Sequence, residues 1–145
     1  MKVLNEMKLT VPSNSSNEAF ARAAVAAFVA QLDPTVEELS DIKTAVSEAV
    51  TNCTVHAYPD RIGKIYISAA ILESRIIRIK VRDSGCGIAD IGQAMQPMFT
   101  TLGGERAGLG FAVMQSFTDA LSVRSKVGRG TAVTMTKRLS YRAKA

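Results

Sequence analysis

Long apolar runs are absent from this sequence of 145 residues, which excludes a membrane-spanning helix of ordinary length. Such a helix needs about 20 consecutive apolar residues, whereas the longest apolar stretch, 23–30, is followed at once by Gln31 and soon by Asp33. An apolar secretory signal is missing too, because Asn5 and Glu6 interrupt the first residues. We therefore expect a cytoplasmic protein that does not interact with membranes.

Cysteine and histidine are scarce. The two cysteines, Cys53 and Cys86, lie far apart in the chain, and the only histidine is His56. Neither cysteine has the neighbouring cysteine or histidine residues that a structural zinc site requires. We expect two reduced thiols, as is usual in a reducing compartment.

An excess of negative charge is also lacking, since 18 Lys and Arg against 13 Asp and Glu give a formal net charge of +5. The basic residues are dispersed, with the densest groups at 75–82 and 137–144. Such charges suit solvated faces, an acidic partner protein or a nucleotide phosphate. No helix-turn-helix, zinc module or aromatic platform is visible, so we expect no direct binding of nucleic acid.

The composition, with 47% hydrophobic and 21% charged residues, is that of an ordinary globular chain. No internal repeat or low-complexity tract is present. At this length about two thirds of the unfolded surface can be buried, which is enough for one core. We predict a single domain over residues 1–145.

The first part of the chain has the pattern of one strand and two helices. Residues 3–11 alternate in polarity and predict a strand. Two capping boxes follow, each expected to open a helix, and the second helix should run to about residue 56. The boxes are Ser15 with Glu18 and Thr35 with Glu38.

The remaining chain is mostly strands. Alternating polarity predicts one hairpin of strands, with its apolar side chains on one face and its basic side chains on the other. This order predicts an α+β fold, namely a two-layer α/β sandwich with a mixed, mostly antiparallel sheet and helices on one face. The predicted elements are strands 64–71 and 75–82, a short helix 88–95, a loop 97–108, a helix 109–121, and strands 122–126 and 131–139.

Glu48 and Asn52 lie one turn apart on a polar stripe of the second predicted helix. An amide oxygen is a suitable ligand for Mg²⁺, which keeps most of its waters and takes few protein ligands. A carboxylate one turn away can accept a proton from a hydroxyl that attacks a metal-bound phosphate. The spacing is common, so a solvated helix face also explains the pair.

Asp83, Gly85 and Gly87 form an Asp-x-Gly-x-Gly motif at the end of a predicted strand. A carboxylate can accept a hydrogen bond from the exocyclic amine of adenine, whereas guanine presents a carbonyl there and is rejected. The glycines permit close approach of the backbone to a flat ligand. In isolation, an ordinary Asp-Ser-Gly turn explains the same residues.

The segment 103–111 is rich in glycine and runs into the third predicted helix. Backbone N–H groups at such a helix start bind anions, and Arg106 adds a charged donor for a terminal phosphate. The spacing is not that of a Walker A loop, and no Rossmann strand precedes it. A phosphate site and a flexible surface loop both remain open.

The three motifs occur together in the order and context of one known family. The sequence resembles the ATP-binding domain shared by DNA gyrase B subunits, Hsp90 chaperones, sensor histidine kinases and MutL, over almost the whole chain. The matching residues are Glu48 and Asn52 (the N box), Asp83, Gly85 and Gly87 (the first glycine box), Gly108 and Gly110 (the second), and Gly130 with Thr131 (a late contact near adenine).

Within that family the sequence is similar to the sporulation anti-sigma F factors, which are serine kinases. The similarity extends beyond the generic boxes, to 20–22, 26–35, 46–52, 96–97 and 99–101. It implies a homodimer that holds a sigma factor, sigma F, and phosphorylates a serine of an anti-anti-sigma factor. On this basis Arg22 would lie on the surface that meets the sigma factor.

The same resemblance implies ATP with Mg²⁺ as cofactors, and ADP as product or alternative ligand. Carried over by position, Glu48 is the general base, Asn52 the Mg²⁺ ligand and Asp83 the adenine anchor, while Arg106 lies near the γ-phosphate. Further nucleotide contacts are implied for Gly85, Gly87, Thr100, Thr101, Gly108, Leu109, Gly110 and Thr131.

Two features depart from the pattern of these kinases. Ala57 stands where a glycine usually follows the histidine, and the lid segment 102–104 is short and has no lysine. Phosphoryl transfer depends on positioning and charge neutralisation, so the closure of this lid and its hold on the phosphates bear on the rate; the sequence leaves open whether the short lid lowers it.

Other functions are compatible with parts of the sequence. One is a related switch kinase for a stress sigma factor. Another is a nucleotide-gated module that sequesters sigma without catalysis, although such a module would not need Glu48. A histidine kinase fragment is disfavoured, because His56 lies within the predicted nucleotide-binding helix.

Overall fold

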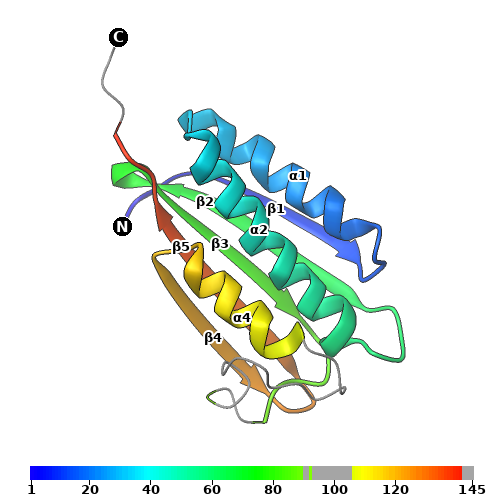
Figure 1. The fold of residues 1–145 in the computed structure, drawn as a ribbon. Helices are drawn as coiled ribbons and strands as arrows, with labels where there is room; N and C mark the ends of the chain where they lie inside the picture. The colour runs from blue at the N-terminus through cyan, green and yellow to red at the C-terminus, as the bar shows by residue number, and fades with distance from the viewer. Residues whose placement is uncertain (90–91, 93–105, 142–145) are drawn as a thin grey trace.

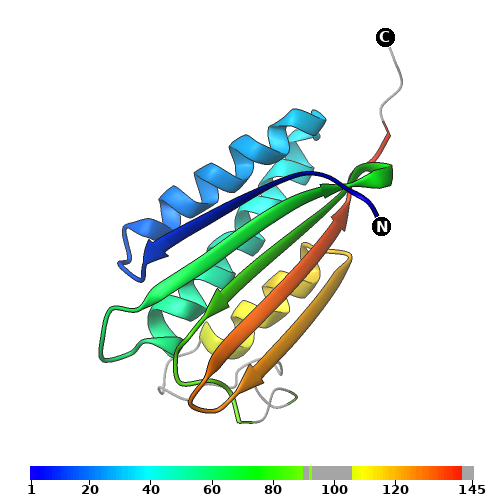
Figure 2. The ribbon, with the colours of Figure 1, turned by 180° about the vertical axis from the view of Figure 1, so that it is seen from behind.

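The computed structural model describes residues 1–89, 92 and 106–141. In these ranges five strands form one sheet, and three α-helices pack on one of its faces (Figure 1). Seen from behind, the opposite face of the sheet carries no helix in the described part of the chain (Figure 2). The strands are β1 (Val3–Pro12), β2 (Lys64–Leu72), β3 (Ile76–Asp83), β4 (Ala120–Lys126) and β5 (Gly130–Arg138), and the helices are α1 (Asn17–Val29), α2 (Val36–Asn52) and α4 (Arg106–Ser116).

The strand order is β1-β2-β3-β5-β4, and each of the four pairings is antiparallel. The predicted α+β sandwich with helices on one face is thus confirmed, and its sheet is antiparallel throughout the described strands. β3 is the middle strand, with the end of β3 beside the start of β5. The motif that begins at Asp83 therefore lies at the end of the middle strand, where β3 and β5 are neighbours.

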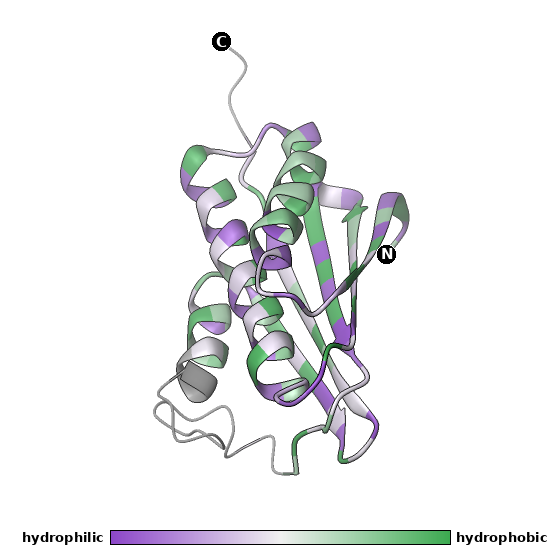
Figure 3. Cartoon of the chain, turned by 90° about the vertical axis from the view of Figure 1, so that its right-hand side faces the viewer, coloured by the Kyte–Doolittle hydropathy of each residue, from purple (hydrophilic) through white to green (hydrophobic). Residues whose placement is uncertain are grey.

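The core lies between the helices and the sheet, as the side view indicates (Figure 3). In β3, Ile77, Ile79 and Val81 are buried beneath the helices, while the basic side chains between them are exposed. This alternation confirms the predicted faces of the strand, because neighbouring side chains in a strand point to opposite sides. Within the described residues no helix is both long enough and apolar enough to cross a membrane.

The two predicted capping boxes have different outcomes. At α2 the box is present: Thr35 Oγ1 accepts the Glu38 N–H at 3.0 Å, and Glu38 Oε1 accepts the Thr35 N–H at 2.9 Å. At α1 the prediction was wrong, because the helix begins after Ser16 and no side chain caps it. Ser16 already has helical backbone angles, and a turn in which the Glu18 N–H bonds the Ser15 carbonyl leads into the helix.

The ends of two helices also differ from the prediction. α2 ends at Asn52, and a π-helical turn, Cys53–Ala57, continues it. The helix predicted over 109–121 ends at Ser116, because the Asp119 N–H bonds the Thr136 carbonyl and the chain joins the sheet there. The short helix predicted at 88–95 and the loop at 97–108 lie mostly outside the described residues.

Glu38 has a second structural role. Its Oε2 accepts the N–H of Ser140 at 2.7 Å, which ties the start of α2 to the residues after β5. Burial by itself would raise the pKa of Glu38, but the hydrogen bonds from Thr35 and Ser140 leave that pKa below its usual value. The folded protein therefore favours the ionised carboxylate.

We expect Glu38→Gln to lower the free energy of unfolding by about 1–2 kcal/mol at neutral pH, because a charged acceptor that serves two backbone donors is replaced by an amide. Since folding lowers the pKa of Glu38, its contribution is lost as the pH falls through that lowered pKa. Urea unfolding should show a smaller difference at about pH 3 than at neutral pH. Glu37→Gln, at an exposed neighbour in the same turn, is the control; an equal effect there would contradict the assignment.

Candidate nucleotide-binding site

Asp83 ends the middle strand of the sheet, and only 6% of its surface is exposed. Its Oδ1 accepts two backbone N–H groups, from Gly85 at 2.9 Å and from Thr131 at 3.2 Å. Its Oδ2 accepts the thiol of Cys53, whose sulfur lies 3.5 Å away. One buried carboxylate is therefore held by three segments: the loop after β3, the start of β5 and the residue that follows α2.

Burial raises the pKa of the Asp83 carboxyl. The hydrogen bonds from Gly85, Cys53 and Thr131, together with the charge of Arg82, oppose part of this rise. A buried carboxylate with a perturbed pKa is a frequent feature of ligand sites. A ligand N–H group would stabilise the ionised form further.

Gly130 makes the contact between Asp83 and Thr131 possible. Its φ of 126° lies in a region that side chains strongly disfavour, and a Cβ there would lie 2.1 Å from the Asp83 carbonyl oxygen. The turn between β4 and β5 can therefore close onto the end of β3. This closure places the Thr131 N–H against the carboxylate.

Gly85 packs against the π-helical turn that follows α2. A Cβ on Gly85 would lie 2.3 Å from the Ala57 carbonyl oxygen and 2.6 Å from the Ala57 methyl group. The same carbonyl accepts the N–H of Cys86 at 3.1 Å. A Cβ on Gly87 would lie 2.3 Å from the Lys126 carbonyl oxygen. Both glycines let the loop after Asp83 fit between the turn that follows α2 and the β4–β5 turn. Gly85 also leaves room for Ala57, which stands where related kinases usually have a glycine.

Glu48 and Asn52 lie one turn apart near the end of α2, and both are half-buried. α4 packs over them at Gly110, where an added Cβ would lie 3.0 Å from Asn52 Oδ1 and 3.4 Å from Glu48 Oε2. The absence of a side chain at Gly110 lets the two helices approach here. The structure thus brings the N box and the second glycine box together, although they are far apart in the sequence.

The amide of Asn52 fits a metal ion. Its Nδ2 is buried and has no hydrogen-bond partner among the described residues. An amide can turn over with little change in shape, which would place the oxygen there as an acceptor without a donor. Such an oxygen is the ligand type that Mg²⁺ prefers, with phosphate and water supplying the other ligands.

Other predicted site residues lie at or before the start of α4. Thr100 and Thr101 fall outside the described residues. Gly108 and Leu109 lie in the first turn of α4, of which the structure describes only the backbone. Arg106 is the first residue of that helix, and its side chain is outside the described part, so its contact with a terminal phosphate stays a prediction.

Tyr58 and Cys53 were not among the site residues predicted from the sequence, yet both shape the site. Tyr58 is 3% exposed, and its hydroxyl donates to the Lys64 carbonyl at 2.7 Å and accepts the N–H of Ser84 at 2.6 Å. It thereby fixes the residue that follows Asp83. No local spacing indicates this role, because Tyr58 and Ser84 are 26 positions apart.

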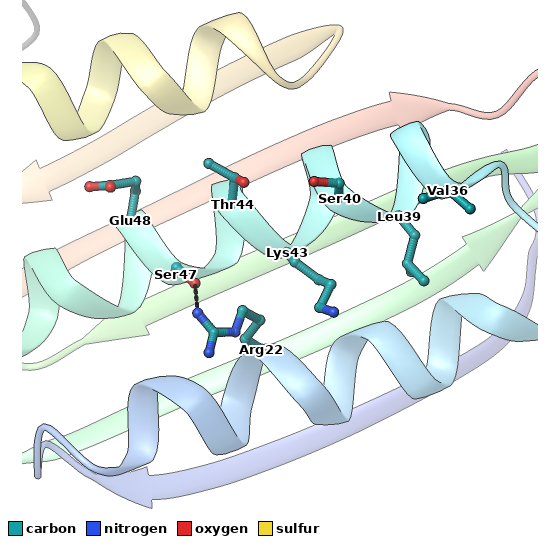
Figure 4. A pocket seen from close by; sticks show the side chains of 8 residues that line it. All are labelled: Arg22, Val36, Leu39, Ser40, Lys43, Thr44, Ser47 and Glu48. Atoms are coloured by element: carbon teal, nitrogen blue, oxygen red, sulfur yellow. Dashed lines mark hydrogen bonds between the residues drawn. The ribbon is translucent and has the colours of Figure 1, made fainter.

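A groove of about 630 Å³ runs along α2 and includes Glu48 (Figure 4). Arg22 reaches it from α1, with its Nη1 3.3 Å from Ser47 Oγ and 3.2 Å from Glu18 Oε1. Arg22 therefore contacts the residue that precedes the predicted general base, while the Glu48 side chain points away from it, toward α4 (Figure 4). The other lining residues are Val36, Leu39, Ser40, Lys43 and Thr44.

Known structures share this fold. The RsbU and RsbW domains of Rv1364c from Mycobacterium tuberculosis match with a TM-score of 0.71 and 23% identity, over 97% of this chain and 33% of that one. The mycobacterial sensor histidine kinase MprB matches with a TM-score of 0.57 and 16% identity, over 92% of this chain and 100% of that one. At such identities the likeness is evidence of a common fold.

Sequence comparison is more specific. The family model for the histidine kinase-like ATPase domain matches residues 11–137, and the chain belongs to that family. The anti-sigma F factor of Caldanaerobacter subterraneus subsp. tengcongensis is 60% identical over 138 residues, which are 94% of this chain and 96% of the relative. That of Bacillus subtilis is 49% identical over 138 residues, 94% of each. Within the ATPase family, the chain is therefore a member of the anti-sigma F factors, as its motifs indicated.

Proposed function

We propose that this chain is an ATP-dependent protein-serine kinase that binds and inhibits sigma F in the cytoplasm and phosphorylates a serine of an anti-anti-sigma factor. The observation that carries the proposal is at the end of α2. There Glu48 and Asn52 face Gly110, and the next residue, Cys53, contacts Asp83. One helix end thus joins a candidate phosphate site to a candidate adenine site.

Adenine recognition is assigned to Asp83. Its buried carboxylate accepts the exocyclic amine of the base, and it disfavours guanine, whose carbonyl would face a negative charge without a donor. The glycines at 85 and 87 keep the neighbouring backbone close and free of side chains. The Thr131 N–H holds the carboxylate in place from β5.

The phosphates are assigned to Asn52 and the start of α4. Asn52 would hold Mg²⁺, which when bound neutralises charge on the β- and γ-phosphate oxygens. The backbone N–H groups of Gly108 and Leu109, in the first turn of α4, suit a phosphate. We assign Arg106, with Thr100 and Thr101, to the same end of the nucleotide.

Glu48 is assigned as the general base. It accepts the proton of the serine hydroxyl as that oxygen bonds to the γ-phosphorus. The bond from the γ-phosphorus to the bridging oxygen breaks, and ADP leaves. A module that only sequesters a partner would have no need of a carboxylate at this place.

The partners are assigned to the groove along α2. It includes Glu48, so a serine of an acceptor protein lying in it could reach the base. Arg22 borders the groove and is the residue that we assign to the sigma factor. A homodimer is inferred from the relation to anti-sigma F factors.

The proposal is tested with labelled ATP, Mg²⁺ and candidate anti-anti-sigma proteins. We expect Glu48→Gln to lower phosphoryl transfer at least about 100-fold, because proton transfer by a positioned base contributes that much or more. ATP affinity should change little, since Glu48 is assigned neither to the adenine ring nor to the metal ion. Glu37→Gln, an exposed carboxylate on the same helix, is the control for activity.

Two outcomes would contradict the proposal. Equal labelling by wild type and Glu48→Gln would exclude Glu48 as the base. Sigma binding that depends on nucleotide and survives Glu48→Gln, with no label transferred by either protein, would instead support a sequestering module.

A further inference from the structure

Three donors among the described residues bond the carboxylate of Asp83, and they leave one acceptor position for a ligand. An ionised carboxylate offers about four lone-pair positions. The N–H groups of Gly85 and Thr131 use the two on Oδ1, and the Cys53 thiol uses one on Oδ2. The remaining position is on Oδ2, so a bound base and the thiol would share the same oxygen.

Cys53 is held rigidly in this arrangement. It is 3% exposed and opens the π-helical turn after α2. Its N–H bonds the carbonyls of Ala49 and Val50, and its carbonyl accepts the Tyr58 N–H at 3.2 Å. The position of the Cys53 backbone is therefore set by the helix rather than by the loop that carries Asp83.

The thiol donates its proton to Asp83 Oδ2 in a hydrogen bond, with the sulfur 3.5 Å from that oxygen. Burial raises the pKa of Cys53 well above its usual value, and the negative charge of Asp83 raises it further. A thiol is a weak donor, so it can orient the carboxylate while leaving most of the negative charge available to a ligand. An alanine at this position would leave Oδ2 without its only protein donor among the described residues.

We propose that Cys53 is a positioning residue for adenine recognition, which turns the open position of Asp83 Oδ2 toward the amino group of the base. The inference rests on the proposed binding of ATP and adds a specificity determinant to it. Since the amino group and the thiol donate to the same oxygen, ATP should weaken the hydrogen bond from the Cys53 thiol to Asp83. A nucleotide without the amino group should leave that bond unchanged.

The first test compares ATP with purine riboside triphosphate, which lacks the 6-amino group. We expect Cys53→Ala to weaken ATP binding about 3- to 10-fold, the size of one modest hydrogen bond, and to leave the analogue unaffected. Cys86→Ala is the matched control, because that exposed thiol donates to the His56 carbonyl at 3.2 Å instead of to a carboxylate. Equal weakening of both nucleotides would mean that Cys53 only supports packing and would overturn the proposal.

The second test is made on the wild-type protein, and the Cys53→Ala variant serves only to identify the band. The infrared S–H stretching band of Cys53, identified by its loss in Cys53→Ala, should move to higher frequency when ATP binds. It should not move with purine riboside triphosphate. A Cys53 band that ATP leaves in place would overturn the inference.

The binding of adenine by Asp83 and the positioning role of Cys53 can be refuted separately. If Asp83→Asn binds ATP as tightly as wild type, the assignment of adenine to Asp83 is wrong, and the role of Cys53 falls with it. If Asp83→Asn loses ATP but Cys53→Ala does not, only the positioning role is refuted.

Discussion

Asp83→Asn should lower the affinity for ATP about 30- to 100-fold while leaving the protein without nucleotide at least as stable as wild type. The loss follows from replacing a charged acceptor, whose hydrogen bonds contribute about 1.5–3 kcal/mol, by an amide. The amide oxygen can still accept the N–H groups of Gly85 and Thr131, but its NH₂ group would face the amino group of adenine.

Stability should not fall, because burial makes ionised Asp83 unfavourable in the folded state. Folding raises the pKa of this carboxyl, so the protein loses stability as the pH rises through the raised pKa, and the asparagine avoids that loss. ATP binding by wild type has the opposite dependence: it weakens as acid protonates Asp83, since the neutral group is a poorer acceptor.

Calorimetric titration with ATP and urea unfolding without nucleotide measure the two effects. Asp60→Asn, at an exposed loop position, is the control. Undiminished ATP affinity, or a large loss of stability without nucleotide, would show that Asp83 serves the fold rather than the ligand.

Gly130→Ala should destabilise the protein by about 3 kcal/mol or more. The added methyl group would lie 2.1 Å from the backbone carbonyl of Asp83, at a φ of 126° that alanine avoids. Backbone atoms cannot move aside as a flexible side chain can, so β5 must separate from the end of β3. ATP binding should fall as well, because the Thr131 N–H would leave the carboxylate.

Gly128→Ala is a matched control in the same turn. Its φ of 79° is also unfavourable for alanine, but a Cβ there would meet nothing within 4 Å. We expect a cost of about 1–2 kcal/mol from the backbone alone. Urea unfolding of both variants gives the comparison, and equal losses would show that the close approach to Asp83 does not matter.

Local patterns predicted most of the elements. The alternation in β3 predicted which side chains are buried, since each side chain responds to its own face of the sheet. The Thr35 box was also predictable, because donor and acceptor are only three residues apart. The same logic failed at Ser15, where the chain before α1 already turns like a helix. It failed as well at the end of α4, where pairing with β5 decides the boundary.

Longer-range features were not accessible from spacing. The β2–β3 hairpin and the β4–β5 hairpin could pair through either of their outer strands. The placement of β5 between β3 and β4 could therefore be learned only from the structure. The motifs around Glu48, Asp83 and Gly110 were predictable because their residue types suggest a chemistry. The roles of Cys53 and Tyr58 were not, because each depends on a contact about 26 to 30 positions away.

The strand order has a consequence for folding. β2 and β3 form a local hairpin, whereas the bond between Thr131 and Asp83 spans 48 positions. A loop of that length must close before the contact forms, so the adenine pocket is completed late, when β5 docks on β3. A nucleotide that needs both residues can bind only the finished sheet, and it should slow unfolding rather than accelerate folding.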